Sequence, residues 1–404
     1  MAWRVVNVMS LRLEFVTLAA QPGAKLSELC RRFGVSRQTG YKWLARFGEA
    51  GEAGLVDRSR RPHGSPSRTD AAVEEAVLAV RRANRCWGGR KIRRVLLNAR
   101  PEGLPAEQVP AASTITGILR RHGLLERDEP APQPFKRFEA VAPNRLWQMD
   151  FKGHFALDGR TDGGGVRCWP LTVLDDHSRY AIGAEACTDE KEVTVCERLT
   201  KVFERHGLPD AIITDNGAPW GHQNGVTKYT RFSVWLLRLG VKPLHSRPRH
   251  PQTMGKIERL HRSLRAELLQ GRRFADLDAV QSGLDRWRAR YNHQRPHDAL
   301  GGAFPASRYR MSERSMPARL VEPDYPDDQV TGRVRRNGCL RCRPQDQRRV
   351  DLQLSAAFAD QRVAVRPSAE DGVHHVWFMT WRIAKVDFRT NPERPTVTHV
   401  LERM

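Results

Sequence analysis

Three acidic residues stand in local settings that favour metal-dependent chemistry. Asp150 and Asp215 each lie at the polar end of a short apolar run that predicts a buried strand, and Glu258 lies in the first turn of a strongly helical stretch. Carboxylates that converge from such positions can hold two divalent cations roughly 4 Å apart, which activate a water or hydroxyl and stabilise the leaving oxygen of a phosphodiester. The three acids therefore predict a phosphoryl-transfer enzyme.

The charge of the chain indicates a nucleic-acid substrate. Its 68 lysines and arginines outnumber its 46 acidic residues, which gives a net charge of +22 over 404 residues. Each cation that replaces a condensed counterion on DNA adds affinity. Ribosomal and membrane-surface proteins are also basic, but here the charge is interrupted by apolar segments and is not gathered into tails. Double-stranded DNA is therefore the expected partner.

Cysteine use and hydropathy indicate a reducing cytoplasm. The seven cysteines form no disulfide-like framework. Cys339 and Cys342 lack a second ligand pair, so they do not predict a zinc site. No apolar run approaches the roughly 18 residues that span a bilayer, and we expect no membrane contact. Asn7, Arg12 and Glu14 exclude a signal-peptide core at the N-terminus.

Residues 9 to 56 predict a helix-turn-helix DNA-binding domain, with a tight turn at Gly34 and a helix cap at Ser36. Its helices are expected over residues 11 to 20, 26 to 33 and 36 to 47. In such a domain the start of the last helix enters the major groove. The side chains that would face bases and phosphates there are Arg37, Gln38, Thr39 and Lys42. An ordinary small helical bundle remains the alternative for this segment.

A basic linker is expected over residues 57 to 69. This segment is rich in Pro, Gly, Ser and Arg and has almost no apolar residue to bury. Basic linkers of this kind can lie along a groove or a phosphate backbone, and Arg60 and Arg61 are the expected contacts. A solvated spacer is the alternative interpretation.

Residues 70 to 128 predict a second helix-turn-helix-like domain. Its helices are expected over residues 70 to 84, 89 to 99 and 113 to 122. We expect Ser113 to cap the last of them, and Thr114 and Thr116, near its start, to contact DNA. Two such domains joined by a basic linker could recognise a longer site than one domain can cover.

Beyond a Pro-rich break, residues 143 to 310 predict an α/β domain with a mixed sheet and a helical extension from residue 276. Strands are expected over residues 147 to 157, 171 to 175, 180 to 186, 211 to 214 and 241 to 244, the last of them at a sheet edge. Helices are expected over residues 189 to 205, 230 to 239 and 255 to 270. Both strand-end aspartates and Glu258 fall in this domain.

A small β-barrel that binds DNA is predicted at residues 330 to 390. Short alternating segments occur at residues 348 to 354, 362 to 366, 376 to 380 and 383 to 388. The arginine-rich stretch from residue 333 to 343 favours DNA as the ligand. The chain is thus expected to be multidomain, with an all-α N-terminal region, an α/β core and a C-terminal barrel.

Several ordered motifs of the α/β domain together resemble the integrase core of DDE transposases. They are Trp147-Gln-Met-Asp150, Leu174-Asp-Asp-His-Ser-Arg-Tyr180, Thr214-Asp-Asn-Gly217, Pro251-Gln-Thr-Met-Gly-Lys-Ile-Glu-Arg259 and Tyr291-Asn-His-Gln-Arg-Pro-His297. The resemblance implies an RNase H-like fold. The two upstream helical sets resemble bacterial insertion-sequence transposases in particular, which implies a nucleoid-associated protein in a bacterial cytoplasm and assembly into a homo-oligomer on DNA.

The resemblance assigns the catalytic and metal-binding acids to Asp150, Asp215 and Glu258, with two Mg²⁺ or Mn²⁺ ions as cofactors. The chain between Asp215 and Glu258 is somewhat longer than is usual in this superfamily, and the surplus is expected in the loop at residues 218 to 226. On the last core helix, Arg262 and Arg265 follow Glu258 at helical spacing, so both are expected to line the phosphate path.

Other polar and aromatic residues near these motifs have weaker indications. Lys256 is a further expected DNA contact. Asp175 and Asp176 are expected to hold the hairpin turn through Asx-type bonds. Trp147 is expected in the core, whereas Trp220 in the longer loop is expected to contact an unpaired DNA end. Turn histidines are expected to be structural or solvent-facing; these are His177, His245 and His250.

The sequence thus predicts a transposase that binds the terminal inverted repeats of its element, cleaves the ends and joins them to target DNA. A sequence-specific repressor with an integrase-like core is one alternative. Three carboxylates that repel phosphate argue against it, because binding alone does not require them. A metal-dependent nuclease without strand transfer is the other alternative, and only the terminal DNA-binding domains argue against it.

Overall fold

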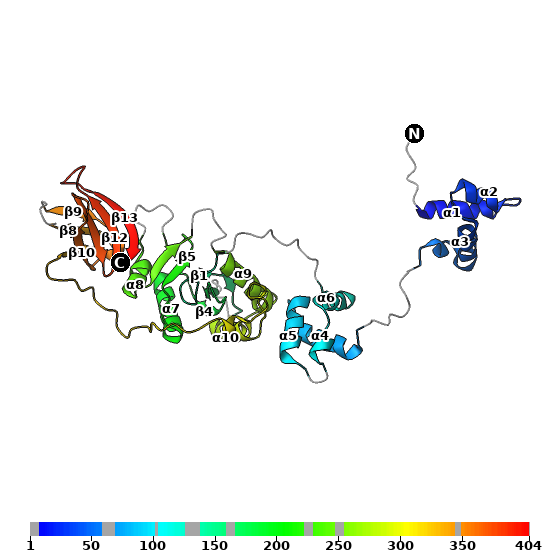
Figure 1. Ribbon diagram of the computed structural model, residues 1–404, viewed down its shortest axis with the longest axis horizontal. Coiled ribbons are helices and arrows are strands. Elements are labelled where there is room, and N and C mark those ends of the chain that lie inside the picture. Colours follow the sequence, from blue (N-terminus) through cyan, green and yellow to red (C-terminus); the bar gives the residue numbers. More distant parts are fainter. Residues whose placement is uncertain are drawn as a thin grey trace. The chain divides into compact units, whose positions relative to one another are not determined.

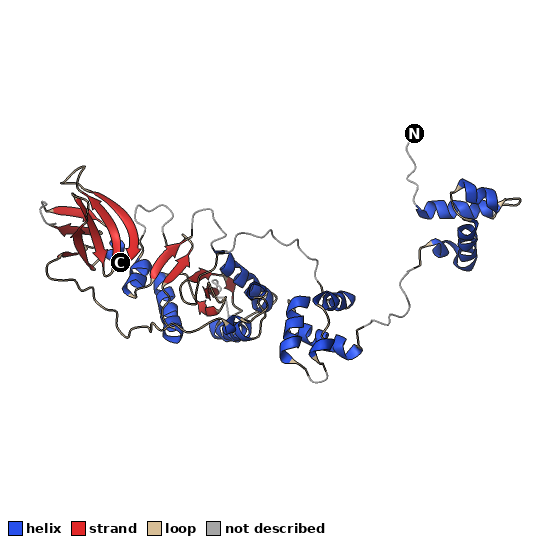
Figure 2. Cartoon of the chain, viewed as in Figure 1, coloured by secondary structure: helices blue, strands red, loops and turns tan. Residues whose placement is uncertain are grey.

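The computed structural model describes residues 8–58, 69–101, 104–125, 138–158, 166–221, 229–246, 254–343 and 349–403. The chain divides into two units, residues 1–68 and 69–404. The first unit contains helices alone among its described residues, whereas the second combines helices with two groups of strands (Figures 1 and 2). In the described part of the chain, no helix is long and apolar enough to cross a membrane.

The first unit contains the predicted three helices. They are α1 (Val8–Ala19), α2 (Leu26–Arg32) and α3 (Arg37–Ala50), followed by a 3-10 turn (Gly51–Leu55). Gly34 adopts a positive φ of 64° in the turn before α3. The Ser36 side chain accepts a hydrogen bond from the Thr39 backbone N–H and caps α3, as predicted. Trp43 of α3 is buried in the core of this unit and defines the inward face of the helix.

The second unit begins with another three helices, α4 (Ala71–Ala83), α5 (Gly89–Ala99) and α6 (Ala112–Arg121). Their shared core includes Ile92 and Ile115, both fully buried. The prediction that Ser113 caps α6 is wrong. The helix begins at Ala112, and its N-cap residue Ala111 makes no side-chain bond. Ser113 therefore already lies inside the first turn, two residues beyond the N-cap position.

The central sheet contains β1 (Trp147–Phe151), β2 (Phe155–Ala156), β3 (Arg167–Asp175), β4 (Ala181–Cys187), β5 (Ala211–Thr214) and β6 (Lys242–His245). β3 pairs antiparallel with β1, β2 and β4, whereas β5 pairs parallel with both β1 and β6. The sheet is therefore mixed, and β6 lies at its edge, as predicted.

Helices complete the core around this sheet. They are α7 (Glu192–His206), α8 (Arg231–Arg238), α9 (Gly255–Leu264) and α10 (Leu277–His293), and a π-helical turn (Arg265–Leu269) follows α9. One buried cluster joins the sheet to α7 and α8 around the fully buried Trp147, and a second joins it to α9 and α10 around Trp287. The fold thus places α9, with Glu258, directly against the sheet.

The expectation that Trp220 contacts DNA is wrong. Its side chain is only 2% exposed, stacks on Phe151 at a centroid distance of 5.5 Å and meets Phe232 edge-on. Burial of a large aromatic ring in a nearby apolar cluster stabilises the fold more than exposure of the ring to solvent for contact with a DNA base. Trp220 therefore belongs to the core of the sheet domain.

The C-terminal region is an antiparallel β-domain. Its strands are β7 (Val330–Arg333), β8 (Cys339–Cys342), β9 (Val350–Gln353), β10 (Arg362–Pro367), β11 (Val373–Phe378), β12 (Trp381–Asp387) and β13 (Thr396–Arg403). Five of them run in the order β13-β12-β11-β10-β7, and β8 pairs with β9. No pairing in the described part of the chain closes these strands into a barrel. β13 lies beyond the predicted limit at residue 390.

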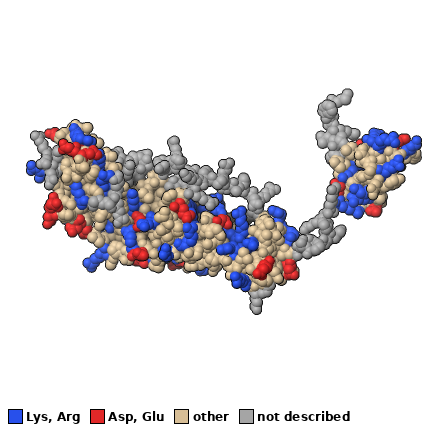
Figure 3. All heavy atoms as spheres, viewed as in Figure 1, with Lys and Arg blue, Asp and Glu red and all other residues tan. Residues whose placement is uncertain are grey.

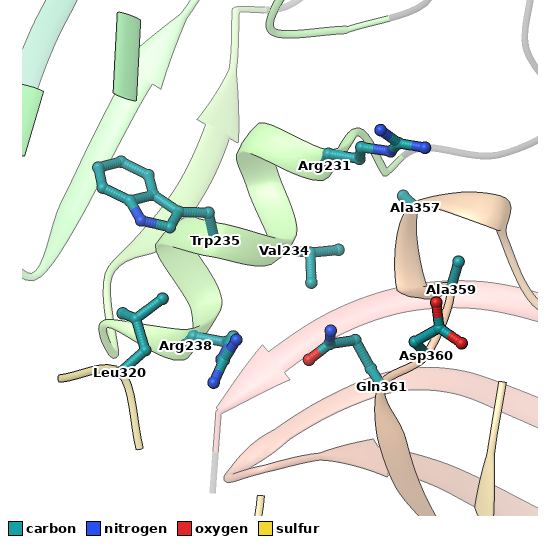
Figure 4. A pocket seen from close by; sticks show the side chains of 9 residues that line it. All are labelled: Arg231, Val234, Trp235, Arg238, Leu320, Ala357, Ala359, Asp360 and Gln361. Carbon is teal, nitrogen blue, oxygen red and sulfur yellow. The ribbon is translucent and has the colours of Figure 1, made fainter. Parts of the chain in front are cut away.

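Among the described residues of the second unit, short 3-10 turns lie at Ala106–Gln108, Asp298–Leu300, Pro305–Ser307 and Ala356–Phe358. The β-domain contacts α8, because Trp381 Nε1 donates to the Leu237 carbonyl at 3.1 Å. Beside this contact, a cavity of about 370 Å³ lies between α8 and residues 357 to 361 (Figure 4). None of the predicted site residues lines it.

Candidate active site

The register of two parallel strands sets Asp150 and Asp215 at the same edge of the sheet. Trp147 of β1 pairs with Ile212 of β5, and Gln148 pairs with Ile213. Each aspartate lies three residues after the first member of this register, so the two side chains come at the same level of neighbouring strands. Parallel pairing thus supplies the convergence that the sequence predicted for these acids.

A short turn after β5 fixes the orientation of Asp215. Its Oδ1 accepts a hydrogen bond from the Gly217 backbone N–H at 3.0 Å, which is an Asx turn. A Cβ atom at Gly217 would lie 3.2 Å from Oδ2, so glycine leaves this carboxylate room. The backbone carbonyl of Asp215 faces His245 Nδ1 at 3.1 Å. Asp215 itself remains exposed to solvent.

The start of α9, and with it Glu258, is tied to β1 by one buried side chain. Gln148 Oε1 accepts from the Ile257 backbone N–H at 3.2 Å, and its Nε2 donates to Asp176 Oδ1 at 2.9 Å. Lys256 Nζ forms an ion pair with the same Asp176 oxygen at 2.5 Å. These bonds connect β1, the hairpin and the first turn of α9. They place Glu258 beside the strand that carries Asp150.

The two adjacent aspartates of the hairpin have different roles. Asp175 accepts from the backbone N–H of Ser178 at 2.7 Å and of Asn144 at 2.8 Å, so it holds the turn as predicted. Asp176 is also fully buried, but it holds Lys256 and Gln148 and accepts from the Ala140 N–H at 2.7 Å. The Lys256 ammonium is thus bound to an internal carboxylate, which does not favour its predicted contact with DNA.

The three acids interact electrostatically. The pKa of Asp150 is raised to about 7, first by burial, then by the carboxylate of Asp215, with a further contribution from Glu258. Among the described residues, no lysine or arginine forms an ion pair with any of the three. Close oxygen ligands without a protein counter-charge are the donor set that Mg²⁺ and Mn²⁺ prefer. Across the described ranges, however, no three His, Cys, Asp or Glu side chains form a ready metal-ligand group.

His261, one helical turn after Glu258, was not predicted as a site residue. Its Nε2 lies 2.7 Å from Thr172 Oγ1, and its Nδ1 lies 3.9 Å from Asp150 Oδ2. Burial, with a smaller contribution from Lys152, lowers the pKa of His261 to about 4, so the ring is neutral near pH 7. The helical spacing from Glu258 could have indicated His261 as a site residue. Its partner Thr172, however, lies on β3, far away in the sequence.

Arg262 and Arg265 share the exposed face of their helix with Glu258. Neither arginine forms an ion pair within the described residues. This arrangement agrees with the predicted spacing along one face. Their contact with phosphates stays a prediction.

The predicted DNA-reading residues of α3 are largely accessible. Arg37, Gln38 and Lys42 are exposed, and Lys42 Nζ lies 4.5 Å from the centroid of the Trp43 ring. Thr39 is half-buried, and its hydroxyl lies 2.9 Å from the capping hydroxyl of Ser36. The predicted contacts at residues 60 and 61 lie outside the described residues. Lysines and arginines cover much of the visible face of this unit (Figure 3).

The predicted contacts on α6 have a different setting. Thr114 is exposed, whereas Thr116 is half-buried and its hydroxyl donates to the Ala112 carbonyl at 2.8 Å. The first turn of α6 also lies against Gly89 of α5. A Cβ at Gly89 would come within 2.3 Å of the Ala112 carbonyl oxygen and 2.6 Å of Thr116 Oγ1. Thr116 is thus part of the contact between α5 and α6.

Family comparisons cover all of these regions. Residues 140–251 and 239–305 each match an Integrase core domain family. Residues 11–63 match a Helix-turn-helix domain, and residues 39–119 match a Homeodomain-like domain. Residues 331–394 match the C-terminal domain of IS481 family transposases. The predicted fold classes of the N-terminal region and of the core are thereby confirmed.

Two curated relatives are proteins of insertion elements. A 31.7 kDa protein of insertion element IS407 from Burkholderia multivorans is 29% identical over 41% of this chain and 55% of its own length. A 39.2 kDa protein of insertion element IS476 from Xanthomonas euvesicatoria is 25% identical over 49% of this chain and 53% of its own length. Together with the integrase core and IS481 transposase domain matches, these similarities support a DDE transposase of an insertion sequence. The chain spans about half the length of these relatives.

Solved structures of retroviral integrases are also similar to the chain. The HTLV-2 integrase catalytic core in complex with magnesium is 17% identical, with a TM-score of 0.30 over 43% of this chain and 100% of that one. The simian T-cell lymphotropic virus intasome is 16% identical, with a TM-score of 0.36 over 71% of this chain and 96% of that one.

Proposed function

We propose that the protein is a DNA transposase that binds the terminal inverted repeats of its element, cleaves the ends and joins them to target DNA. The observation that carries this proposal is the position of Asp150 on β1 and of Asp215 directly after the parallel strand β5, with the start of the Glu258 helix bonded to β1 through Gln148. We further propose that the protein assembles as a homo-oligomer on DNA.

The three carboxylates would hold two divalent cations, Mg²⁺ or Mn²⁺, which supply Lewis-acid stabilisation of the phosphodiester oxygens. Water would attack a phosphodiester at the element end, breaking its P–O3′ bond and releasing a 3′-hydroxyl. That hydroxyl would then attack a target phosphodiester, forming a new bond and releasing a target 3′-hydroxyl. Arg262 and Arg265 would bind flanking phosphates and position the end.

Substitution of single acids tests the proposal. Asp150→Asn, Asp215→Asn and Glu258→Gln should each reduce end cleavage and joining to the level of a protein-free control, because each removes a cation ligand. Binding to the terminal repeat should persist. The exposed Glu204→Gln on α7 serves as a matched control and should retain activity. The assay uses labelled terminal repeats, supercoiled target DNA and Mg²⁺ or Mn²⁺.

The products separate the alternatives. Wild-type protein that cleaves ends but never joins them to target would be a nuclease, and protein that binds ends without cleaving them would be a repressor. Substantial activity of Glu258→Gln would mean that another residue is the third acid.

A further inference from the structure

The imidazole of His261 has a defined tautomer. The Thr172 hydroxyl donates its only proton to the Asp150 carbonyl at 3.0 Å. Its oxygen can therefore only accept from His261, 2.7 Å away, which places the ring proton on Nε2. A neutral imidazole has one N–H, so Nδ1 carries a lone pair. This lone pair lies on the side of the ring nearest Asp150.

Two hydrogen-bond acceptors, His261 Nδ1 and Asp150 Oδ2, thus face each other, and no donor lies between them among the described residues. His261 Nδ1 and Asp150 Oδ2 are 3.9 Å apart, too far for a direct hydrogen bond. Nitrogen and oxygen ligands each lie about 2.1 Å from a small divalent cation, so a separation of up to about 4.2 Å lets one ion contact both. Histidines that bind metals usually donate their other ring N–H to an oxygen, as His261 donates to Thr172.

We propose that His261, through Nδ1, supplies a nitrogen ligand beside Asp150 for one divalent cation of the active site, so that this site favours Mn²⁺ over Mg²⁺. The inference rests on the proposed function. Its chemical basis is that imidazole suits transition-metal ions better than Mg²⁺, which prefers oxygen ligands alone. His261 is 8% exposed and Thr172 is fully buried, so the pair is already ordered before any cation or DNA arrives.

The test uses the full chain with Mn²⁺ and without DNA. Electron spin echo modulation of bound Mn²⁺ should show an imidazole ¹⁴N coupling in the wild type and lose it in His261→Gln. His245→Gln is the matched control, because His245 is the histidine beside Asp215, and it should keep the coupling. Thr172→Val should weaken the coupling, because it removes the hydroxyl that fixes the tautomer of His261. Thermal unfolding of each variant reports whether it folds.

Affinities give a second measurement. In His261→Gln, the Kd for Mn²⁺ should rise about tenfold and that for Mg²⁺ by less than about threefold. If His261→Gln does not fold, His261→Asn replaces it, because its amide keeps a polar group near the position of Nδ1.

The outcomes separate the two proposals. Mn²⁺ that binds without nitrogen coupling, or coupling that survives in His261→Gln, overturns the role of His261 and leaves the proposed function standing. Failure of the wild type to bind Mn²⁺ at all overturns both.

Discussion

The two helical sets upstream of the core have the same number of helices but use the start of their last helix differently. In the first set, Ser36 caps α3, and Arg37 and Gln38 remain exposed with no ion pair among the described residues. In the second set, α6 has no side-chain cap, and its first turn packs against Gly89 of α5. A shared helical topology therefore does not imply a shared reading surface. We infer that α3 reads bases and that the start of α6 serves mainly for packing.

The largest expected effect is on stability, and it concerns one glycine in each of the two helical sets. A Cβ at Gly89 would meet a backbone carbonyl oxygen at 2.3 Å, which cannot easily move, so Gly89→Ala should cost about 2–3 kcal/mol. A Cβ at Gly40 of α3 would meet the side-chain atoms Cys30 Sγ at 2.7 Å and Phe15 Cζ at 3.0 Å, which can shift. The gain in helix propensity of about 1 kcal/mol offsets part of that cost.

Hydrogen exchange measured peptide by peptide on the full chain distinguishes these two substitutions. Gly89→Ala should lower protection throughout α4 to α6, and Gly40→Ala should change α1 to α3 much less. Gly48→Ala is the control, because a Cβ there meets nothing within 4 Å. Equal loss of protection from both substitutions would remove the packing difference between the two sets.

An intermediate effect is expected on DNA recognition. Alanine at Arg37 and Gln38 together should weaken specific binding to the terminal repeat about 30-fold or more, since base contacts are worth about 1–3 kcal/mol each. Alanine at Thr114 and Thr116 should weaken it less than about threefold, because the Thr116 hydroxyl already bonds its own helix. Fluorescence anisotropy against terminal and random DNA measures both. A larger loss from the threonine pair would assign base reading to α6.

The smallest effect separates a true cap from an apparent one. Ser36→Ala should lower the stability of the first unit by about 1 kcal/mol, because the Thr39 N–H loses its acceptor. Ser113→Ala should change stability by less than about 0.5 kcal/mol. Exchange protection of the α3 and α6 peptides on the full chain reports both values. Matching losses would mean that Ser113 also stabilises the start of its helix.

Much of the fold was predictable because its signals are local. The apolar runs at β1 and β5, the turn at Gly34 and the cap at Ser36 are each encoded within a few neighbouring residues. The Asx bonds of Asp175 are equally local. The acids were located from the apolar runs and the helical stretch beside them, and the order of the motifs then assigned their roles. β13 was missed because it follows a polar, Pro-containing segment and its pairing partner is β12.

Several differences from the predictions share one physical cause, namely partners that are distant in the sequence. The ion pair of Lys256 was not predicted because its partner Asp176 lies 80 residues earlier, and the contact of Lys256 with DNA stays a prediction. His261 was overlooked because Thr172 lies 89 residues away. Trp220 was assigned to DNA because the rings that cover it come from other segments. Composition and spacing cannot show which buried polar or aromatic group meets which.

The hydrogen bond between Gln148 and Ile257 joins residues 109 positions apart. The three acids can therefore come together only after both segments have been synthesised. A nascent chain that has left the ribosome as far as β6 carries Asp150 and Asp215 but not the helix of Glu258. Its catalytic set is still incomplete at that stage. Synthesis of α9 then completes the set after both helical domains and the sheet have been made. Translation order would thus leave an unfinished chain without its third acid.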